Sequence, residues 1–137
     1  MTVTEREVDR LLGDTLRLGR QMVESGAEIR RVEDTMTRLG RAYGAKKVDI
    51  FAITSDIVLT ILFEDGVELT QTRRIRKSSS FDFVKLEQLN ALSRKICAEK
   101  PELESYEDQL NQVKNAPVYP AWVSVPAVAG ISLAFTL

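Results

Sequence analysis

The sequence predicts an α+β fold, and three patterns carry that prediction. Apolar residues recur at helical spacing before residue 44 and again after residue 82. Between these regions, the run 57–63 is almost wholly apolar and rich in β-branched residues, as in a central strand covered on both faces. Asp65-Gly66 then gives a strong hairpin signal of the type I′ class. The expected order is a helical hairpin, a three-stranded antiparallel meander, two further helices and the start of a transmembrane helix.

The helical hairpin is expected to turn between Glu24 and Glu28. The first helix should end near Glu24, and Ser25 and Glu28 have the Ser-x-x-Glu spacing of a capping box for the second helix. Gly44 is the expected end of that second helix. A glycine within a helix costs roughly 1 kcal/mol relative to alanine, so close contacts are expected wherever one is kept. The glycines concerned are Gly13, Gly19 and Gly40.

The strands are expected at about residues 48–53, 57–63 and 67–75. The third is half polar, which favours the edge of a sheet. Asp82 is placed to cap a third helix, and Pro101 to open a fourth.

The composition of the chain excludes several classes of function. The chain has 137 residues, a net charge of −1 and no histidine, so it lacks the basic field of a nucleic-acid protein and the commonest general base and metal ligand. Its single cysteine, Cys97, excludes an internal disulfide and a cysteine metal cluster, and its helical position predicts a buried, inert thiol. We therefore expect no cofactor, no metal site, no nucleic-acid partner and no enzymatic activity.

Residues 115–137 carry no charged side chain. From Pro120 onward a helix would reach about 27 Å at a rise of roughly 1.5 Å per residue, which barely spans a bilayer core. Tyr119 and Trp122 stand at the start of this run, where an interfacial aromatic belt is expected. We accordingly divide the chain into a cytoplasmic α+β domain, residues 1–116, and an incomplete first transmembrane helix, residues 117–137.

Several segments, in order along the chain, resemble one membrane family. They are Glu24–Thr35, Leu39–Gly44, Val58–Thr60, Thr72–Arg74, Leu89–Arg94 and Tyr119–Trp122. The sequence is similar to the N-terminal half of the threonine/serine exporter-like proteins. This resemblance implies a component of a bacterial inner-membrane exporter of small polar metabolites, either threonine and serine or, in related branches, dicarboxylates. It also implies a cytoplasmic N-terminal domain and a further transporter module, fused or separate, and it leaves homo-oligomerisation open.

Four charged residues are candidates for substrate binding: Glu28, Glu33, Arg73 and Arg74. The carboxylates could bind a substrate amine and the arginines a carboxylate or lipid headgroups. Helix capping, ion pairs on a helix surface and the charges of an edge strand would explain the same residues without a ligand. Two other functions stay open. One is a soluble regulatory or ligand-binding module with a docked C-terminal helix, and the other is a small hydrolase that uses Glu28 or Glu33.

Overall fold

A computed structural model describes residues 5–53, 55–76 and 81–114 and confirms the α+β class, with four helices and three strands in this part of the chain. The elements follow the expected order. They are α1 Glu5–Glu24, α2 Ile29–Ala42, β1 Ala45–Ala52, β2 Asp56–Phe63, β3 Glu68–Arg74, α3 Phe83–Glu99 and α4 Leu103–Lys114. No helix among these residues is long and apolar enough to cross a membrane. The run 117–137, for which a transmembrane helix is expected, lies outside the described residues.

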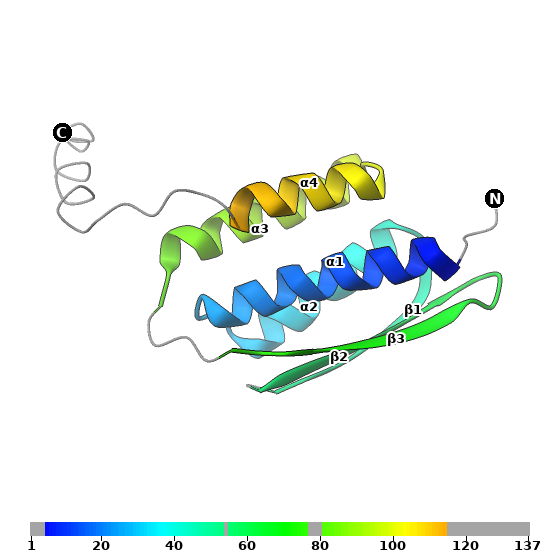
Figure 1. The fold of residues 1–137 in the computed structure, drawn as a ribbon, viewed down its shortest axis with the longest axis horizontal. Coiled ribbons are helices and arrows are strands. Elements are labelled where there is room, and N and C mark those ends of the chain that lie inside the picture. Colours follow the sequence, from blue (N-terminus) through cyan, green and yellow to red (C-terminus); the bar gives the residue numbers. More distant parts are fainter. Residues whose placement is uncertain (1–4, 54, 77–80, 115–137) are drawn as a thin grey trace, which may run out of the picture.

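The elements form three layers (Figure 1). The antiparallel sheet has the order β1-β2-β3, so the half-polar third strand is at an edge, as expected. The helices α1 and α2 pack on one face of the sheet, and α3 and α4 pack on the other side of α1 and α2. The middle layer is therefore buried from both sides.

The central strand corrects one prediction. Side chains of β2 alternate between buried and partly exposed, with Ile57, Leu59, Ile61 and Phe63 directed into the core. Among the described residues, helices cover only one face of the sheet, so the predicted coverage of both faces is wrong for this part of the chain. The opposite face keeps apolar residues beside threonines, and the Thr60 and Thr70 hydroxyls are 2.6 Å apart across the β2–β3 pair. A mostly apolar strand thus occurs here in a sheet that is covered on one side.

The β2–β3 hairpin is confirmed, but its turn is not type I′. A type I′ turn needs positive φ at both central residues, and in this loop only Gly66 has one, at +93°. The amide of Gly66 donates to the Phe63 carbonyl at 3.0 Å, and the Phe63 amide donates to the Val67 carbonyl at 2.9 Å. The connection is therefore a three-residue loop, residues 64–66, whose last residue is Gly66. The Asp65 carboxylate accepts from the Val67 amide at 3.1 Å.

The α1–α2 turn shows a second departure. Glu28 is itself the N-cap of α2 and makes no side-chain capping hydrogen bond, so the predicted capping box is wrong. Ser25 is buried instead, and its carbonyl accepts from the Asp82 amide at 3.0 Å. The turn is thus fixed by the segment before α3. Gly44, with φ of +94°, follows α2 as expected.

Two of the three helical glycines allow close packing. A Cβ added at Gly19 would lie 2.5 Å from Met36 Sδ of α2, and one added at Gly40 would lie 2.8 Å from Val48 Cγ2 of β1. At Gly13 the nearest atom would be at an ordinary 3.5 Å. The expectation of close approach holds at Gly19 and Gly40.

Candidate functional site

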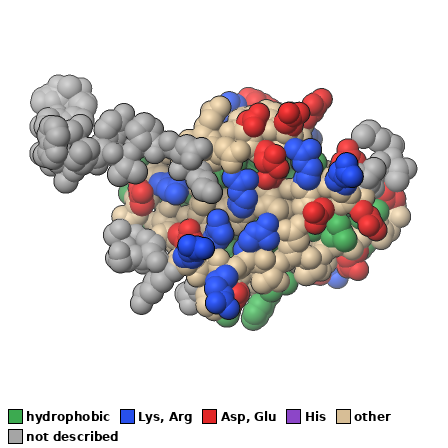
Figure 2. Space-filling model, viewed as in Figure 1, with side chains coloured by type: hydrophobic (Ala, Val, Ile, Leu, Met, Phe, Trp, Pro, Cys, Tyr) green, Lys and Arg blue, Asp and Glu red, His purple; other side chains and the backbone are tan. Residues whose placement is uncertain are grey.

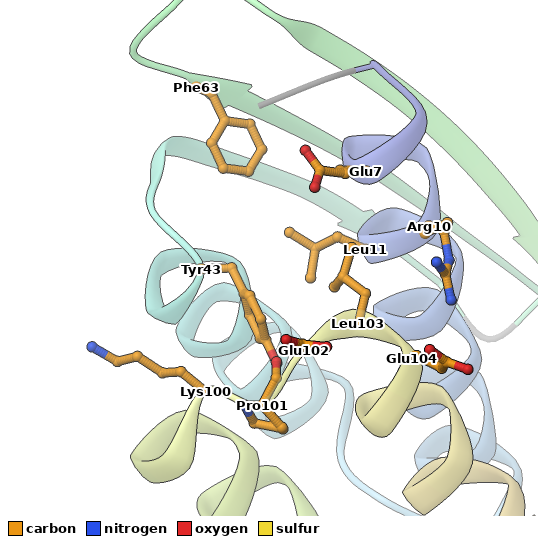
Figure 3. Close-up of a pocket in the computed structure, with 10 residues that line it drawn as sticks. All are labelled: Glu7, Arg10, Leu11, Tyr43, Phe63, Lys100, Pro101, Glu102, Leu103 and Glu104. Atoms are coloured by element: carbon orange, nitrogen blue, oxygen red, sulfur yellow. The ribbon is translucent and has the colours of Figure 1, made fainter. Parts of the chain in front are cut away.

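A pocket of about 480 Å³ lies between the start of α1, the end of α2 and the α3–α4 turn (Figure 3). Its lining combines apolar and charged side chains. The apolar ones are Leu11, Tyr43, Phe63, Pro101 and Leu103, and the charged ones are Glu7, Arg10, Lys100, Glu102 and Glu104. The Glu7 side chain extends from α1 toward Phe63, whereas Lys100 extends away from the turn (Figure 3).

The α3–α4 turn is held in place by its backbone. Lys100 ends α3 in the left-handed conformation, with φ of 48°, and its amide donates to the Ile96 carbonyl at 2.7 Å. The Tyr43 hydroxyl, from the end of α2, donates to the Pro101 carbonyl. This bond ties the turn to the middle layer. Burial raises the pKa of Tyr43 to about 12, so the hydroxyl stays a donor at physiological pH.

A second tyrosine joins the pocket wall to the interior. Tyr106 of α4 is fully buried, and its ring stacks on that of Tyr43 with centroids 5.8 Å apart. Its hydroxyl lies 3.0 Å from the Thr15 hydroxyl of α1. Burial is the main cause that raises the pKa of Tyr106, so this hydroxyl also remains protonated. The two rings therefore connect α1, α2, α4 and the α3–α4 turn.

A polar cluster continues from this contact along the α1–α4 seam. The Asp14 side chain is 3% exposed, and its Oδ1 lies 3.4 Å from Arg17 Nη1. Arg10 pairs with Glu107 of α4 at 3.3 Å. Among the described residues, the buried Oδ2 of Asp14 has no hydrogen-bond partner. Burial, with a smaller effect of Glu107, raises the pKa of Asp14 to about 7 against the opposing effects of Arg17 and Arg10.

The chemistry of the pocket suits a small zwitterion. An apolar floor bordered by a few charged groups is typical of ligand sites. Glu7, Glu102 and Glu104 line the same pocket as Arg10 and Lys100, so charged groups of both signs border it, and Arg10 is also paired with Glu107. Groups of at least three histidine, cysteine, aspartate or glutamate side chains that could hold a metal ion are absent from the part of the chain that the structure describes.

The four residues predicted as substrate ligands do not form one site. Glu28 is exposed at the start of α2, and Glu33 is half-buried in the second turn. Arg73 and Arg74 are neighbours on β3, so their side chains point to opposite faces of the sheet. Arg73 is on the helix-covered face near Gly13, and Arg74 is exposed on the uncovered face. Between the described residues, no ion pair joins either carboxylate to either arginine.

Arginine side chains also lie on the partly exposed side of α1. Figure 2 shows Lys and Arg side chains on this face of the molecule, with Asp and Glu side chains among them. Arg17 and Arg20 of α1 have side chains 22% and 26% exposed. Acidic groups accompany them, since Arg17 pairs with Asp14 and Arg20 lies 3.9 Å from Glu24. The cations therefore serve partly to neutralise carboxylates of the same helix.

Cys97 is half-buried on α3, where the sequence predicts a buried thiol. Burial raises its pKa, with Arg38 opposing the shift. Because the thiolate is the reactive form, a raised pKa makes Cys97 a poor nucleophile. The residues that sequence reasoning missed are those of the pocket and the seam. Asp14 could have been noticed, since it interrupts the apolar pattern of α1 at a core-facing position.

The family comparison agrees with the resemblance noted in the sequence. A scan against protein-family models matches residues 15–137 to ThrE, described as "Putative threonine/serine exporter". Searches of the curated proteins and of the solved structures found no match. The family match covers more than half of the chain, in one continuous stretch from α1 to the end of the uncharged run. The chain therefore belongs to the ThrE family of threonine/serine exporter proteins.

Proposed function

We propose that this chain is a component of a bacterial inner-membrane exporter of threonine and serine. In this proposal residues 1–116 are its cytoplasmic domain and residues 117–137 begin its first membrane helix. The observation that carries the proposal is the family match, which continues from the folded domain through the uncharged run. Transport pathways lie between several helices, so a further membrane module, fused or separate, completes the exporter. Dicarboxylates are a second substrate class to be tested.

The membrane part of the proposal can be tested by fractionation. Tagged residues 1–137 should remain in the membrane pellet after an alkaline carbonate wash. A matched variant, Val128→Arg with Ile131→Arg, should be released, because each arginine near the centre of a membrane helix costs about 2.5–3.5 kcal/mol. Release of both proteins would contradict the anchor and favour a soluble binding module.

Export itself is tested in cells. We expect deletion of the gene to slow the efflux of preloaded labelled threonine and serine, and a plasmid copy to restore it. Labelled succinate serves as the dicarboxylate comparison. Unchanged efflux of all three compounds in the deletion strain would overturn the transport role.

We further propose that the pocket beside Tyr43 contacts the exported amino acid before transport. Its support is the combination of an apolar floor with charged groups of both signs. Titration calorimetry of residues 1–137 in detergent should detect threonine binding that Glu102→Gln weakens. Glu99→Gln is the matched control, because Glu99 is exposed on α3 and does not line the pocket. Equal affinity in both variants would remove the pocket from the proposal and leave the exporter assignment untouched.

The proposed role is not enzymatic. Glu28 is the first candidate for a catalytic carboxylate in the hydrolase alternative, and it is exposed at the start of α2. Turnover of a small ester or amide that Glu28→Ala or Glu33→Ala abolished would contradict this assignment.

A further inference from the structure

Three exposed apolar side chains gather before and at the start of α3. Phe81, Phe83 and Val84 are 60%, 59% and 67% exposed, and the two phenylalanine rings have centroids 6.1 Å apart. We call these three residues the aromatic corner. Scattered apolar residues on a surface need no explanation, whereas contiguous exposed apolar patches are a common feature of interaction sites.

The end of the described chain lies near this corner. α3 and α4 are antiparallel neighbours, and Val113 of α4 lines a surface hollow together with Gln88 of α3. Gln88 is five residues after Phe83, about 7.5 Å along a helix. Figure 1 shows the end of α4 and the start of α3 on the same side of the molecule.

The sequence limits how far the proposed anchor can be from the domain. Five residues, 115–119, separate Lys114 from Pro120, and residues 115–137 carry no charged side chain. Even a fully extended chain would cover only about 20 Å over these steps. If residues 117–137 are in the bilayer, the end of α4 is held close to the headgroups, and so is the aromatic corner.

We propose that the aromatic corner docks into the headgroup region of the bilayer that holds residues 117–137. The inference rests on the membrane anchor of the proposed function. Phenylalanine and valine side chains gain by leaving water at such a boundary, as the apolar face of an interfacial helix does. The charged residue between these side chains, Asp82, is the N-cap of α3, and its carboxylate accepts from the Lys85 amide at 3.0 Å. Docking would fix the orientation of the domain, with α3 toward the lipid and the uncovered sheet face away from it.

Site-specific quenching tests this orientation. Residues 1–137 with Cys97→Ala are reconstituted into phosphatidylethanolamine/phosphatidylglycerol vesicles that carry nitroxide-labelled lipid. An environment-sensitive fluorophore is attached at Val84→Cys or, as the matched control, at Phe51→Cys. Phe51 is 63% exposed on the uncovered sheet face, so its label samples an equally accessible site on the opposite layer. The single tryptophan, Trp122, reports independently on the anchor.

We expect the nitroxide to quench most of the emission of the label at 84 and of Trp122, and little of the emission of the label at 51. Quenching of Trp122 without quenching at 84 would overturn docking while the anchor stands. An unquenched Trp122 would overturn the anchor, and docking with it. Quenching at 51 in place of 84 would reverse the orientation and contradict the inference. A label at 84 that is shielded from water but unquenched, with shielding that grows with protein concentration, would assign the corner to a second copy.

A second variant tests docking without a label. Phe83→Gln with Val84→Gln should leave the thermal midpoint in detergent unchanged, because both side chains are largely exposed. Vesicles should slow amide exchange in the first turns of α3 in the native sequence and not in this variant. Equal protection in both proteins would contradict a role for the corner.

Discussion

The hydroxyl groups of Thr15 and Tyr106 meet 3.0 Å apart in the interior, although 91 residues separate them in the chain. Both residues are fully buried, and the contact joins α1 to α4. A buried hydroxyl without a partner costs free energy, so this pair makes the packing of the two helices specific.

Removing the Tyr106 hydroxyl should destabilise the domain. Tyr106→Phe leaves the buried Thr15 hydroxyl without this partner, and we expect the free energy of unfolding to fall by about 1–2 kcal/mol. Urea unfolding followed by circular dichroism measures the change. In the double variant with Thr15→Val the cost should be smaller than the sum of the two single costs. Additive costs would show that the two hydroxyls do not interact.

Asp14 should make stability depend on pH. Its pKa is about 7 in the folded protein and 3.8 without the fold, so the folded state binds the extra proton. The contribution of Asp14 to the free energy of unfolding is therefore fully present below about pH 4. It is lost as the pH rises toward 7 and stays lost above 7.

Asp14→Asn removes this titration. At pH 8 the variant should be more stable than the native sequence, on the order of 2–4 kcal/mol, since each unit of pKa shift is worth about 1.4 kcal/mol. At pH 4 the difference should nearly vanish. Urea midpoints of both proteins at the two pH values measure this change, and a pH-independent difference would mean that folding does not raise the pKa of Asp14.

The helical glycines should respond in opposite directions to alanine. Gly40→Ala places a methyl group 2.8 Å from the stiff side chain of Val48, and a net loss of about 1 kcal/mol is expected after the gain in helix propensity. Gly13→Ala meets its nearest atom at 3.5 Å and should gain about 0.5–1 kcal/mol. Thermal midpoints of the two variants give the comparison. Two shifts of the same sign would show that helix propensity alone, or packing alone, determines the effect of alanine at both positions.

The cap of α3 offers a local test. Asp82 Oδ1 accepts from the Lys85 amide at 3.0 Å, so Asp82→Ala should cost about 1 kcal/mol. Asp82→Ser can keep the bond and is the control. Amide exchange in the first turn of α3 should accelerate in the alanine variant only.

Local patterns predicted the elements well because periodicity and end signals act over a few residues. The helix limits near Glu24 and Gly44, the hairpin at Gly66 and the cap at Asp82 all follow from such signals. The turn type at Asp65-Gly66 was wrong, since the same dipeptide also closes a three-residue loop in which only the glycine takes positive φ.

The sequence by itself determined the fold class, the order of the elements and the family, because apolar periodicity and ordered motifs are properties of the chain. Only the tertiary structure decided how the layers stack. An apolar face shows that a segment is buried but does not show what covers it. The sequence therefore could not show that the described helices cover one face of β2, or that α1 packs between the sheet and the α3–α4 layer. That stacking buries Asp14 and brings Tyr106 to Thr15. The pocket depends on the same stacking, because its walls come from segments far apart in the chain.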